Sequence, residues 1–182
     1  MEQTDEAIAK LVQRGDVQSF RVLMERYEPK IARYARKFLF YGDEAQDVVQ
    51  DVFFKAYANI LSFDAEQRFS PWIYRIAHNT FINAIKKREK EKGSVSIFDV
   101  DVLFPHPVAK ETADADANRE EMRSMLDASL ATLDPKYREP LVLYYFEELN
   151  YKEIAEILHI PIPTIGIRLK RGKALLKKNF TK

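Results

Sequence analysis

The sequence contains no cysteine, only five glycines and only three histidines among 182 residues. The absence of cysteine excludes disulfide bridges and thiolate metal sites, and three scattered histidines leave little for a zinc or catalytic centre. Few glycines and no Asn-Gly or Asp-Gly pair argue against β-hairpins. No apolar run approaches the length that spans a bilayer, and the segment Met1–Glu6 is acidic where a signal peptide is basic. We therefore expect a cytoplasmic protein with no membrane insertion.

Apolar residues recur over long stretches at the 3.6-residue period of an α-helix, and the chain is 46% hydrophobic and 31% charged. The period fades from Glu91 to about Asn118, and the overlapping stretch Asp99–Glu121 holds seven acidic and two basic residues. We expect an all-α fold of two small helical domains, residues 1–92 and 119–182, joined by an acidic linker at residues 93–118. The alternative is an ordered loop packed on one domain, because residues 95–104 are more apolar than a free tether requires.

The C-terminal domain has the pattern of a helix-turn-helix. Apolar residues at helical spacing in Tyr151–Ile160 predict one helix, Pro161 and Pro163 stop it, and a second helix is expected from about Thr164. From Pro161 onward there are seven cations and no acidic residue, although the whole chain carries only +1. The cations are Arg168, Lys170, Arg171, Lys173, Lys177, Lys178 and Lys182. This segregation suits binding in a DNA major groove, and a solvated basic helix is the plainer alternative.

The N-terminal domain begins with helical patterns. Ile8 and Val12 mark a short helix, and Asp16 is placed to cap the next one. Pro29 should interrupt or kink that second helix before it continues from Ile31 to Phe40. The apolar positions expected in the core are Phe20, Leu23, Met24 and Tyr27.

The segment Asp43–Ile60 predicts a helix with two faces. Its continuous apolar stripe, which we expect to be buried, consists of Ala45, Val48, Val49, Val52, Phe53, Ala56, Tyr57 and Ile60. Phe54 lies off this stripe beside the carboxylates Asp47 and Asp51, which suggests a face that binds a basic protein partner around an apolar anchor. Magnesium binding by Asp43, Asp47 and Asp51 is a weaker alternative, because no second carboxylate-rich helix completes a site.

The segment Ser70–Lys90 predicts a helix that begins with Ser70 as N-cap and Pro71 in the first turn. Ile73, Ile76, Ala77, Thr80 and Ala84 share the face expected to be buried. The neighbouring face carries Trp72, Asn79, Asn83, Lys86 and Lys90. Such a face suits unpaired bases, which an indole can stack on and a carboxamide can hydrogen-bond. In the plainer alternative, the tryptophan covers the preceding loop and the asparagines are merely solvated.

Three long segments now match a known family in order and separation. They are Asp47-Val-Val-Gln-Asp-Val-Phe-Phe-Lys-Ala-Tyr57, Phe69-Ser-Pro-Trp-Ile-Tyr-Arg-Ile-Ala-His-Asn79, and Leu133-Asp-Pro-Lys-Tyr-Arg-Glu-Pro-Leu-Val-Leu-Tyr-Tyr145 followed by the helix-turn-helix. Over nearly its whole length the chain closely resembles the extracytoplasmic-function class of bacterial sigma factors. The resemblance implies two helical domains that bind RNA polymerase core and direct it to promoters.

The resemblance also implies partners and contact residues. In that family the helix matching Asp47–Ile60 docks on a coiled coil of the largest polymerase subunit, and the flap of the polymerase is a further contact. The helix Trp72–Lys90 and the loop Ser62–Phe69 receive the melted non-template strand, with one flipped base held by the loop. The C-terminal helix reads the distal promoter element as duplex DNA. An anti-sigma factor that clamps both domains commonly holds such proteins inactive.

Residue by residue, three sets of contacts are expected, with no catalytic residue, metal or cofactor. The core-polymerase contacts are Asp47, Gln50, Asp51, Phe54 and Lys55. The proximal-element contacts are Phe63, Arg68, Trp72, Arg75, Asn79, Asn83, Lys86 and Lys87. The distal-element contacts are Thr164, Ile167, Arg168, Lys170, Arg171 and Lys173.

Three positions depart from the family pattern. His159 stands where a turn glycine is usual, and histidine adopts the left-handed conformation less readily. Gly166 and Ile167 replace two polar groups expected to face the groove, so direct readout should be poorer in hydrogen bonds. A plain helix-turn-helix regulator and a sigma-mimicking interaction protein therefore remain as alternatives. An enzyme is disfavoured, because the sequence shows no paired nucleophile and base and no phosphate-binding glycine loop.

Overall fold

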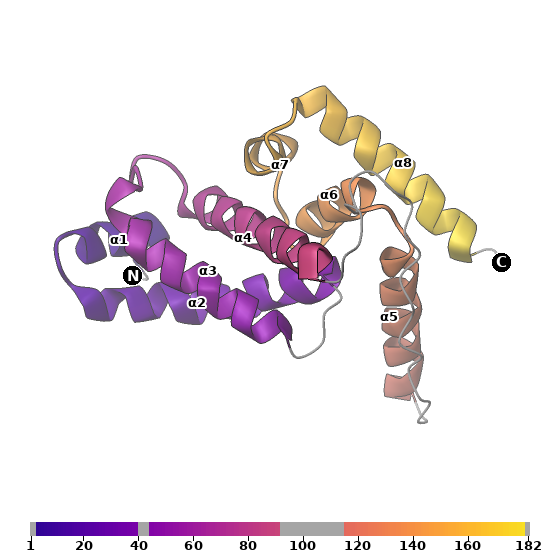
Figure 1. Cartoon of the computed structure of the whole chain (residues 1–182), viewed down its shortest axis with the longest axis horizontal. Coiled ribbons are helices and arrows are strands. Elements are labelled where there is room, and N and C mark those ends of the chain that lie inside the picture. The colour runs from indigo at the N-terminus through magenta and orange to yellow at the C-terminus, as the bar shows by residue number, and fades with distance from the viewer. Residues whose placement is uncertain (1–2, 40–43, 92–114, 181–182) are drawn as a thin grey trace.

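The computed structural model describes residues 3–39, 44–91 and 115–180, and every regular element within these ranges is a helix (Figure 1). The N-terminal elements are α1 (Asp5–Gln13), α2 (Val17–Leu39), α3 (Glu44–Asn59), the 3-10 turn η1 (Ile60–Ser62) and α4 (Phe69–Glu91). The C-terminal elements are α5 (Ala115–Ala131), α6 (Pro135–Tyr145), α7 (Tyr151–Leu158) and α8 (Ile162–Phe180). The all-α prediction is confirmed. Most of the linker expected at residues 93–118 lies outside the described residues. Helix α5 begins at Ala115, within the last residues of that expected linker.

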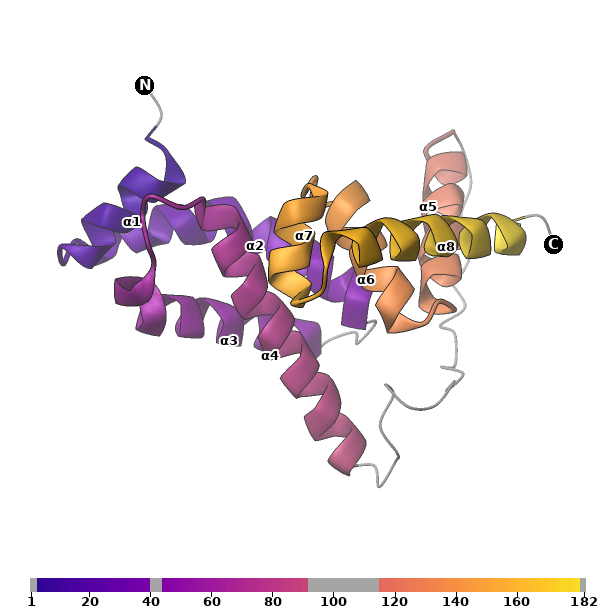
Figure 2. The ribbon, with the colours of Figure 1, turned by 90° about the horizontal axis from the view of Figure 1, so that it is seen from above.

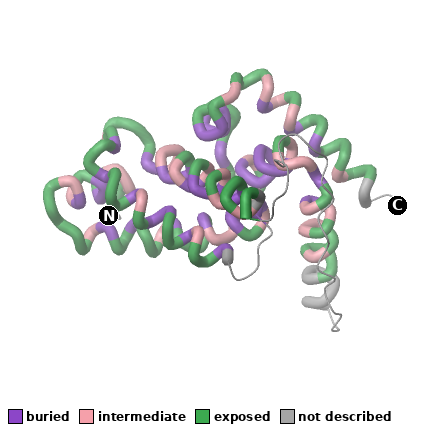
Figure 3. Tube along the Cα trace, viewed as in Figure 1, coloured by how far each residue is buried: buried purple, intermediate pink, exposed green. Residues whose placement is uncertain are grey.

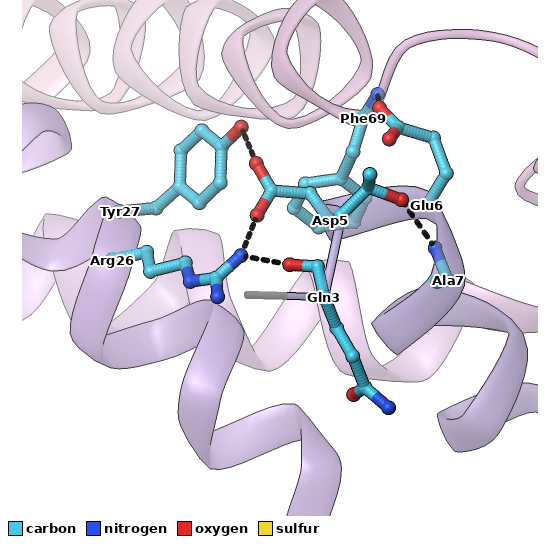
Figure 4. Close-up of polar contacts among 8 residues, drawn as sticks. Gln3, Asp5, Glu6, Ala7, Arg26, Tyr27 and Phe69 are labelled. Carbon is cyan, nitrogen blue, oxygen red and sulfur yellow. Dashed lines mark hydrogen bonds and ion pairs between the residues drawn. The ribbon is translucent and has the colours of Figure 1, made fainter. Parts of the chain in front are cut away.

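Two carboxylates at the start of α1 tie the N-terminal bundle together (Figure 4). Asp5 accepts hydrogen bonds from Arg26 and from the hydroxyl of Tyr27, both at 2.6 Å. Burial and then Asp5 raise the pKa of Tyr27, so its hydroxyl stays protonated as a donor. Glu6 accepts the backbone N–H of Phe69 at 3.0 Å. The expectation that Ser70 caps α4 is therefore wrong, because the helix starts one residue earlier and a side chain from α1 satisfies its first amide.

Helix α2 runs without interruption through Pro29, so of the two outcomes expected there the interruption does not occur. A proline removes one backbone hydrogen bond, but buried residues continue on both sides of it, from Tyr27 to Ile31, and hold the helix against the bundle. Asp16 does interact with the first turn, accepting from the Ser19 hydroxyl at 2.8 Å. Met24 was expected in the core but is 37% exposed.

Helices α6, α7 and α8 form the helix-turn-helix domain. A capping box starts α7, in which Asn150 accepts the backbone N–H of Glu153 at 3.0 Å and Glu153 accepts that of Asn150 at 2.8 Å. His159 ends the helix in the left-handed conformation with φ at 54°. Helix α8 starts at Ile162, two residues before the expected start, because Pro163 fits the first helical turn.

The two domains pack against each other. In Figures 1 and 2, α7 lies beside α4, and α8 points away from the N-terminal bundle. Most of α8 is exposed in Figure 3, and its buried residues, Ile165, Leu169 and Gly172, recur at helical spacing. A Cβ atom built on Gly172 would lie 2.8 Å from Leu141 of α6, so this glycine permits the close approach of α8 to α6.

Candidate docking and nucleic-acid surfaces

Helix α3 presents the face that the sequence assigned to a protein partner. Phe54 is 74% exposed, and Asp47, Gln50 and Asp51 are exposed beside it. The ammonium group of Lys55 lies 2.6 Å from the Asp51 carboxylate and 3.4 Å from the Thr80 hydroxyl, which ties this face to α4. The five expected contact residues therefore lie together on one side of α3.

Two further apolar residues belong to this face and were not expected there from the sequence. Leu61 in η1 is 76% exposed, and Tyr57 was expected to be buried but is 41% exposed, with its edge against Phe20 at a centroid distance of 5.1 Å. Phe54, Tyr57 and Leu61 follow one another at spacings of three and four residues, which places them on one helical side. Leu61 could have been found by extending the helical period past Ile60. We call Asp47, Gln50, Asp51, Phe54, Tyr57 and Leu61 the docking face.

Helix α4 exposes a polar face away from the core. Arg75, Asn79, Asn83, Lys86 and Lys87 are exposed, as expected. The five residues expected to be buried, Ile73, Ile76, Ala77, Thr80 and Ala84, are buried or half-buried. Tyr74, Phe81 and Ile85 extend this buried face, and the sequence prediction did not include them.

Trp72 and Phe63 belong to an aromatic cluster instead of standing free. The ring centroid of Trp72 lies 5.2 Å from Phe63 and 5.3 Å from Phe69, and Trp72 is half-buried. Phe63 is only 4% exposed, so the expectation that its ring contacts DNA does not fit this arrangement. Aromatic packing gives both rings a structural role, which is to fix the loop before α4. This geometry matches the plainer alternative considered for the tryptophan.

A cavity of about 520 Å³ separates that loop from α7. From the N-terminal domain it is lined by Ser62, Phe63, Asp64, Gln67, Arg68, Pro71, Trp72 and Arg75, and from α7 and its cap by Asn150, Lys152, Glu153 and Glu156. The guanidinium of Arg68 forms an ion pair with Glu153 across it. Four expected contacts for the melted strand, Phe63, Arg68, Trp72 and Arg75, therefore line the cavity that faces the second domain.

Helix α8 carries the expected duplex-binding cations on its outer side. Lys170, Arg171 and Lys173 are exposed and Ile167 is 52% exposed, whereas Thr164 and Arg168 are half-buried. A Cβ atom on Gly166 would lie 3.6 Å from the ring of Tyr151, an ordinary contact distance. The position of Gly166 is thus bordered by α7 as well as by solvent, and it has room for a side chain.

A buried carboxylate between the domains was not anticipated from the sequence. The Glu147 side chain is fully buried and accepts two hydrogen bonds from Arg33, each at 2.8 Å, and one from the Tyr74 hydroxyl at 2.6 Å. The bond from Arg33 to Glu147 raises the pKa of the guanidinium against the opposing effect of burial. Burial and then Glu147 raise the pKa of Tyr74, so its hydroxyl remains a donor. Nothing in the local sequence pattern distinguishes Glu147 from an exposed glutamate.

Neither a metal site nor a membrane-spanning helix is found in the part of the chain that the structure describes. Within residues 3–39, 44–91 and 115–180, no three acidic, histidine or cysteine side chains lie close enough together to hold a metal ion. Asp43, the first member of the magnesium alternative, falls outside these ranges. Over the same ranges, no helix combines the length and apolar character that a membrane span requires.

Comparisons with known proteins identify the family to which both domains belong. Residues 23–91 match the family model for sigma-70 region 2, and residues 123–176 match that for sigma-70 region 4. The chain is 34% identical over 175 residues to the ECF RNA polymerase sigma factor SigW of Bacillus subtilis strain 168, covering 94% of each sequence. It is 30% identical over 181 residues to the RNA polymerase sigma-H factor of Pseudomonas aeruginosa, covering 97% of this chain and 94% of that one.

Solved structures share the fold. The sigma factor RpoE of Bartonella quintana, crystallised with the anti-sigma factor NepR, superposes with a TM-score of 0.74 at 25% identity, covering 91% of this chain and 98% of that one. CnrH, solved in complex with the cytosolic domain of CnrY, gives a TM-score of 0.72 at 23% identity and covers 98% of both chains. The similarity thus extends across both helical domains.

Proposed function

Because the chain belongs to the extracytoplasmic-function (ECF) RNA polymerase sigma factors, we propose that it binds polymerase core and directs it to a particular set of promoters. The observation that carries this function is the presence of a docking face, a strand-facing helix and a basic helix-turn-helix on one chain. Since polymerase and chromosome supply its partners, we place the protein in the cytoplasm. We assign it no catalytic step of its own and no cofactor.

The docking face is the proposed contact with core polymerase. Phe54 and Leu61 supply exposed apolar area, and Asp47 and Asp51 flank it with negative charge. Interfaces commonly place an apolar anchor inside a polar rim, and complementary charge orients the approaching partner. A basic coiled coil of the largest polymerase subunit fits this arrangement, and the flap is proposed as the contact of the second domain.

The proximal promoter element is assigned to the exposed face of α4. Arg75, Lys86 and Lys87 are exposed cations that can pair with phosphates, and Asn79 and Asn83 can hydrogen-bond the edges of unpaired bases. Arg68 joins this set from the preceding loop. Trp72 and Phe63 are proposed to support the loop, since both rings pack in the aromatic cluster.

The distal element is assigned to α8. Lys170, Arg171 and Lys173 provide the phosphate contacts or guanine contacts, and Ile167 can meet a thymine methyl. Thr164 and Arg168 are half-buried, so their contacts are expected at the edge of the interface. The proposed division into residues 1–92 and 119–182 separates the two kinds of DNA contact.

An anti-sigma factor is the proposed inhibitor. The similar sigma factor from Bartonella quintana was crystallised with one, and this chain covers nearly all of that protein. A partner that covers the docking face and the α4 face at once would block both polymerase and DNA. A pull-down from cell extract should therefore recover core polymerase or an inhibitor, and not both on the same molecule.

Promoter-dependent transcription by purified core polymerase tests the function directly. Core polymerase with this protein should produce run-off transcripts from genomic fragments that core alone does not transcribe. A plain helix-turn-helix regulator would bind DNA without conferring initiation, and a sigma-mimicking interaction protein would bind neither core nor DNA productively. Core binding without initiation on any fragment of a genomic library would contradict the proposal.

A further inference from the structure

Helix α1 presents one polar side to the loop that precedes α4. Glu6, Lys10 and Gln13 follow one another at spacings of four and three residues, which places them on the same side of the helix. Helix α1 also lies before residues 23–91, the range that matches the region 2 family model. The residues that it buries in the core lie on another side and are Ile8, Ala9 and Val12.

Gln13 holds the start of that loop. Its side-chain Nε2 donates to the backbone carbonyl oxygen of Ile60 at 2.8 Å and to that of Phe63 at 2.7 Å. Both carbonyls lie at the end of η1, where the hydrogen bonds within the helix run out. The Ile60 carbonyl also accepts the backbone N–H of Phe63 at 3.1 Å. One half-buried carboxamide therefore fixes the direction in which the chain leaves η1.

Glu6 holds the other end of the loop, where α4 begins (Figure 4). Its carboxylate accepts the backbone N–H of Phe69 at 3.0 Å, and the Phe69 ring is buried. Lys10 pairs with Glu66 at 2.8 Å between these ends, but both side chains are exposed, so this ion pair adds little stability. The loop is thus fixed to α1 at both ends, whereas its middle exposes Asp64, Glu66, Gln67 and Arg68.

We propose that α1 positions this loop for promoter recognition, and that Gln13 and Glu6 set how strictly the loop discriminates one base of the melted proximal element. The inference rests on the proposed function, because it takes the loop Ser62–Phe69 as the holder of that base. A loop already held in its binding conformation loses less conformational freedom when a ligand binds. Discrimination is a difference between two affinities, and a loosened loop rearranges to accept other bases. Releasing the loop should therefore reduce discrimination at one base position and leave the positions read by α4 unchanged.

The first measurement follows the loop in the full chain without a partner. Trp72 is the only tryptophan of the sequence, and its ring centroid lies 5.2 Å from that of Phe63 and 5.3 Å from that of Phe69. Its fluorescence therefore reports the packing of both loop ends. Gln13→Met removes both donors with little change in side-chain volume, and it should increase the quenching of Trp72 by acrylamide. Gln18→Met, the same change at an exposed glutamine of α2, is the matched control and should leave the quenching unchanged.

The second measurement is base preference. Isolated complexes of each full-length protein with core polymerase are mixed with a single-stranded DNA library of fully random sequence, and the bound strands are sequenced, with core polymerase alone as background. In Gln13→Met, the preference for one base over the others should fall about threefold or more at one position and stay the same elsewhere. Gln18→Met should select as the wild type does at every position. Because the complexes are isolated first, a change in affinity for core polymerase does not enter the result.

Glu6 supplies a second pair of variants that leaves Gln13 in place. Glu6→Gln retains a side-chain oxygen that can accept the Phe69 N–H, so it should keep the wild-type preference. Glu6→Met removes the acceptor and should lower the preference at the same position as Gln13→Met does. The pair separates the hydrogen bond from the charge of Glu6. Circular dichroism and thermal melting establish that each variant is folded, and Glu6→Met remains available should Gln13→Met unfold.

The outcomes separate this inference from the proposed function. Equal quenching of Trp72 in Gln13→Met and the wild type, or equal base preference at every position, would overturn the positioning role alone. A preference that weakens evenly over all positions would also overturn it, because a general loss of structure would then be the cause. Wild-type complexes that select no base at any position would contradict the proposed function itself, and the inference with it.

Discussion

Among the described residues, Phe54 and Leu61 are the most exposed of the large apolar side chains, whereas Glu147 has a fully buried side chain. Both cases reverse the usual distribution, in which apolar groups are inside and carboxylates outside. Exposed apolar area beside charge indicates a surface that a partner covers. A buried carboxylate indicates neighbours that compensate it, and here these are Arg33 and Tyr74 from the other domain.

The docking face yields a prediction for single side chains. Phe54→Ala and Leu61→Ala should each weaken binding to core polymerase by about 1 to 3 kcal/mol if they are central to the interface, and Asp51→Ala should slow association. Surface plasmon resonance on immobilised core polymerase measures both quantities. Val22→Ala is the control, because Val22 is an exposed apolar residue on α2 outside the docking face. Equal affinities for all of these variants would rule out the assigned face.

His159 allows a prediction about backbone strain. Its φ of 54° lies in the left-handed region, where a residue with a Cβ atom is less stable than glycine. His159→Gly should therefore raise the free energy of unfolding by roughly 0.5 to 1 kcal/mol. Ala174→Gly, in the exposed interior of α8, should lower it by roughly 1 kcal/mol. Urea denaturation compares the two, and a loss of stability in His159→Gly would mean that the imidazole makes a stabilising contact.

At the scale of elements, α8 shows how one helix serves two purposes. Its inner side packs on α6 through Ile165, Leu169 and Gly172, and its outer side presents Lys170 and Arg171. The helical period alone separates these sides. The helical period does not show which glycine of α8 contacts a neighbouring helix. That depends on the distance between the helix axes, which only the packed domain fixes.

The two glycines of α8 should respond differently to alanine. Gly166→Ala should stabilise the protein by roughly 1 kcal/mol, since its Cβ atom has 3.6 Å to Tyr151 and the helix gains propensity. In Gly172→Ala the new Cβ atom meets buried Leu141 at 2.8 Å and the Tyr137 carbonyl oxygen at 3.3 Å. The resulting repacking, about 1 to 3 kcal/mol, should cancel or exceed the gain. Thermal unfolding with a higher melting temperature for Gly172→Ala than for Gly166→Ala would contradict this packing.

Duplex binding by α8 should be dominated by charge. Affinity for distal-element DNA should fall steeply as the salt concentration rises. Arg171→Ala should reduce this affinity, and if Arg171 reads a guanine the loss should be about 1 to 3 kcal/mol and should depend on the base pair at that position. Gly166→Lys should tighten binding and steepen the salt dependence, because it adds a cation where the structure leaves room. Titrations of the full chain at several salt concentrations test this. A folded Gly166→Lys protein with weaker binding would mean that DNA approaches the helix too closely there for a side chain.

At the scale of the whole molecule, the domains share one continuous packed region and enclose the loop before α4 between them. The proximal-element contacts that we propose require this loop and the α4 face to become accessible to a melted strand. Under that proposal, the packed arrangement of the two domains and the DNA-bound one would be different conformations, and their relative populations would set the apparent affinity for DNA.

Promoter opening provides the whole-molecule prediction. In complexes with core polymerase, Asn79→Ala and Asn83→Ala should reduce formation of the open promoter complex and relax base preference in the proximal element, while affinity for core stays normal. Permanganate footprinting of single-base promoter variants measures the bubble. Gln46→Ala, an exposed polar position on α3, serves as control. Footprints that match those of the wild type on every variant promoter would show that these carboxamides do not read the strand.

By itself the sequence determined the helical class, most of the buried and exposed positions of α3 and α4, and the basic character of α8, because helical periodicity and charge are properties of neighbouring residues. Its three long motifs also identified the family. Tertiary structure alone decided that Glu6 caps α4, that Phe63 is buried, and that Glu147 lies between the domains. Each of these features depends on groups that folding brings together from distant parts of the chain. The local spacing of residues does not indicate which of several similar carboxylates or aromatic rings will contact such a distant group.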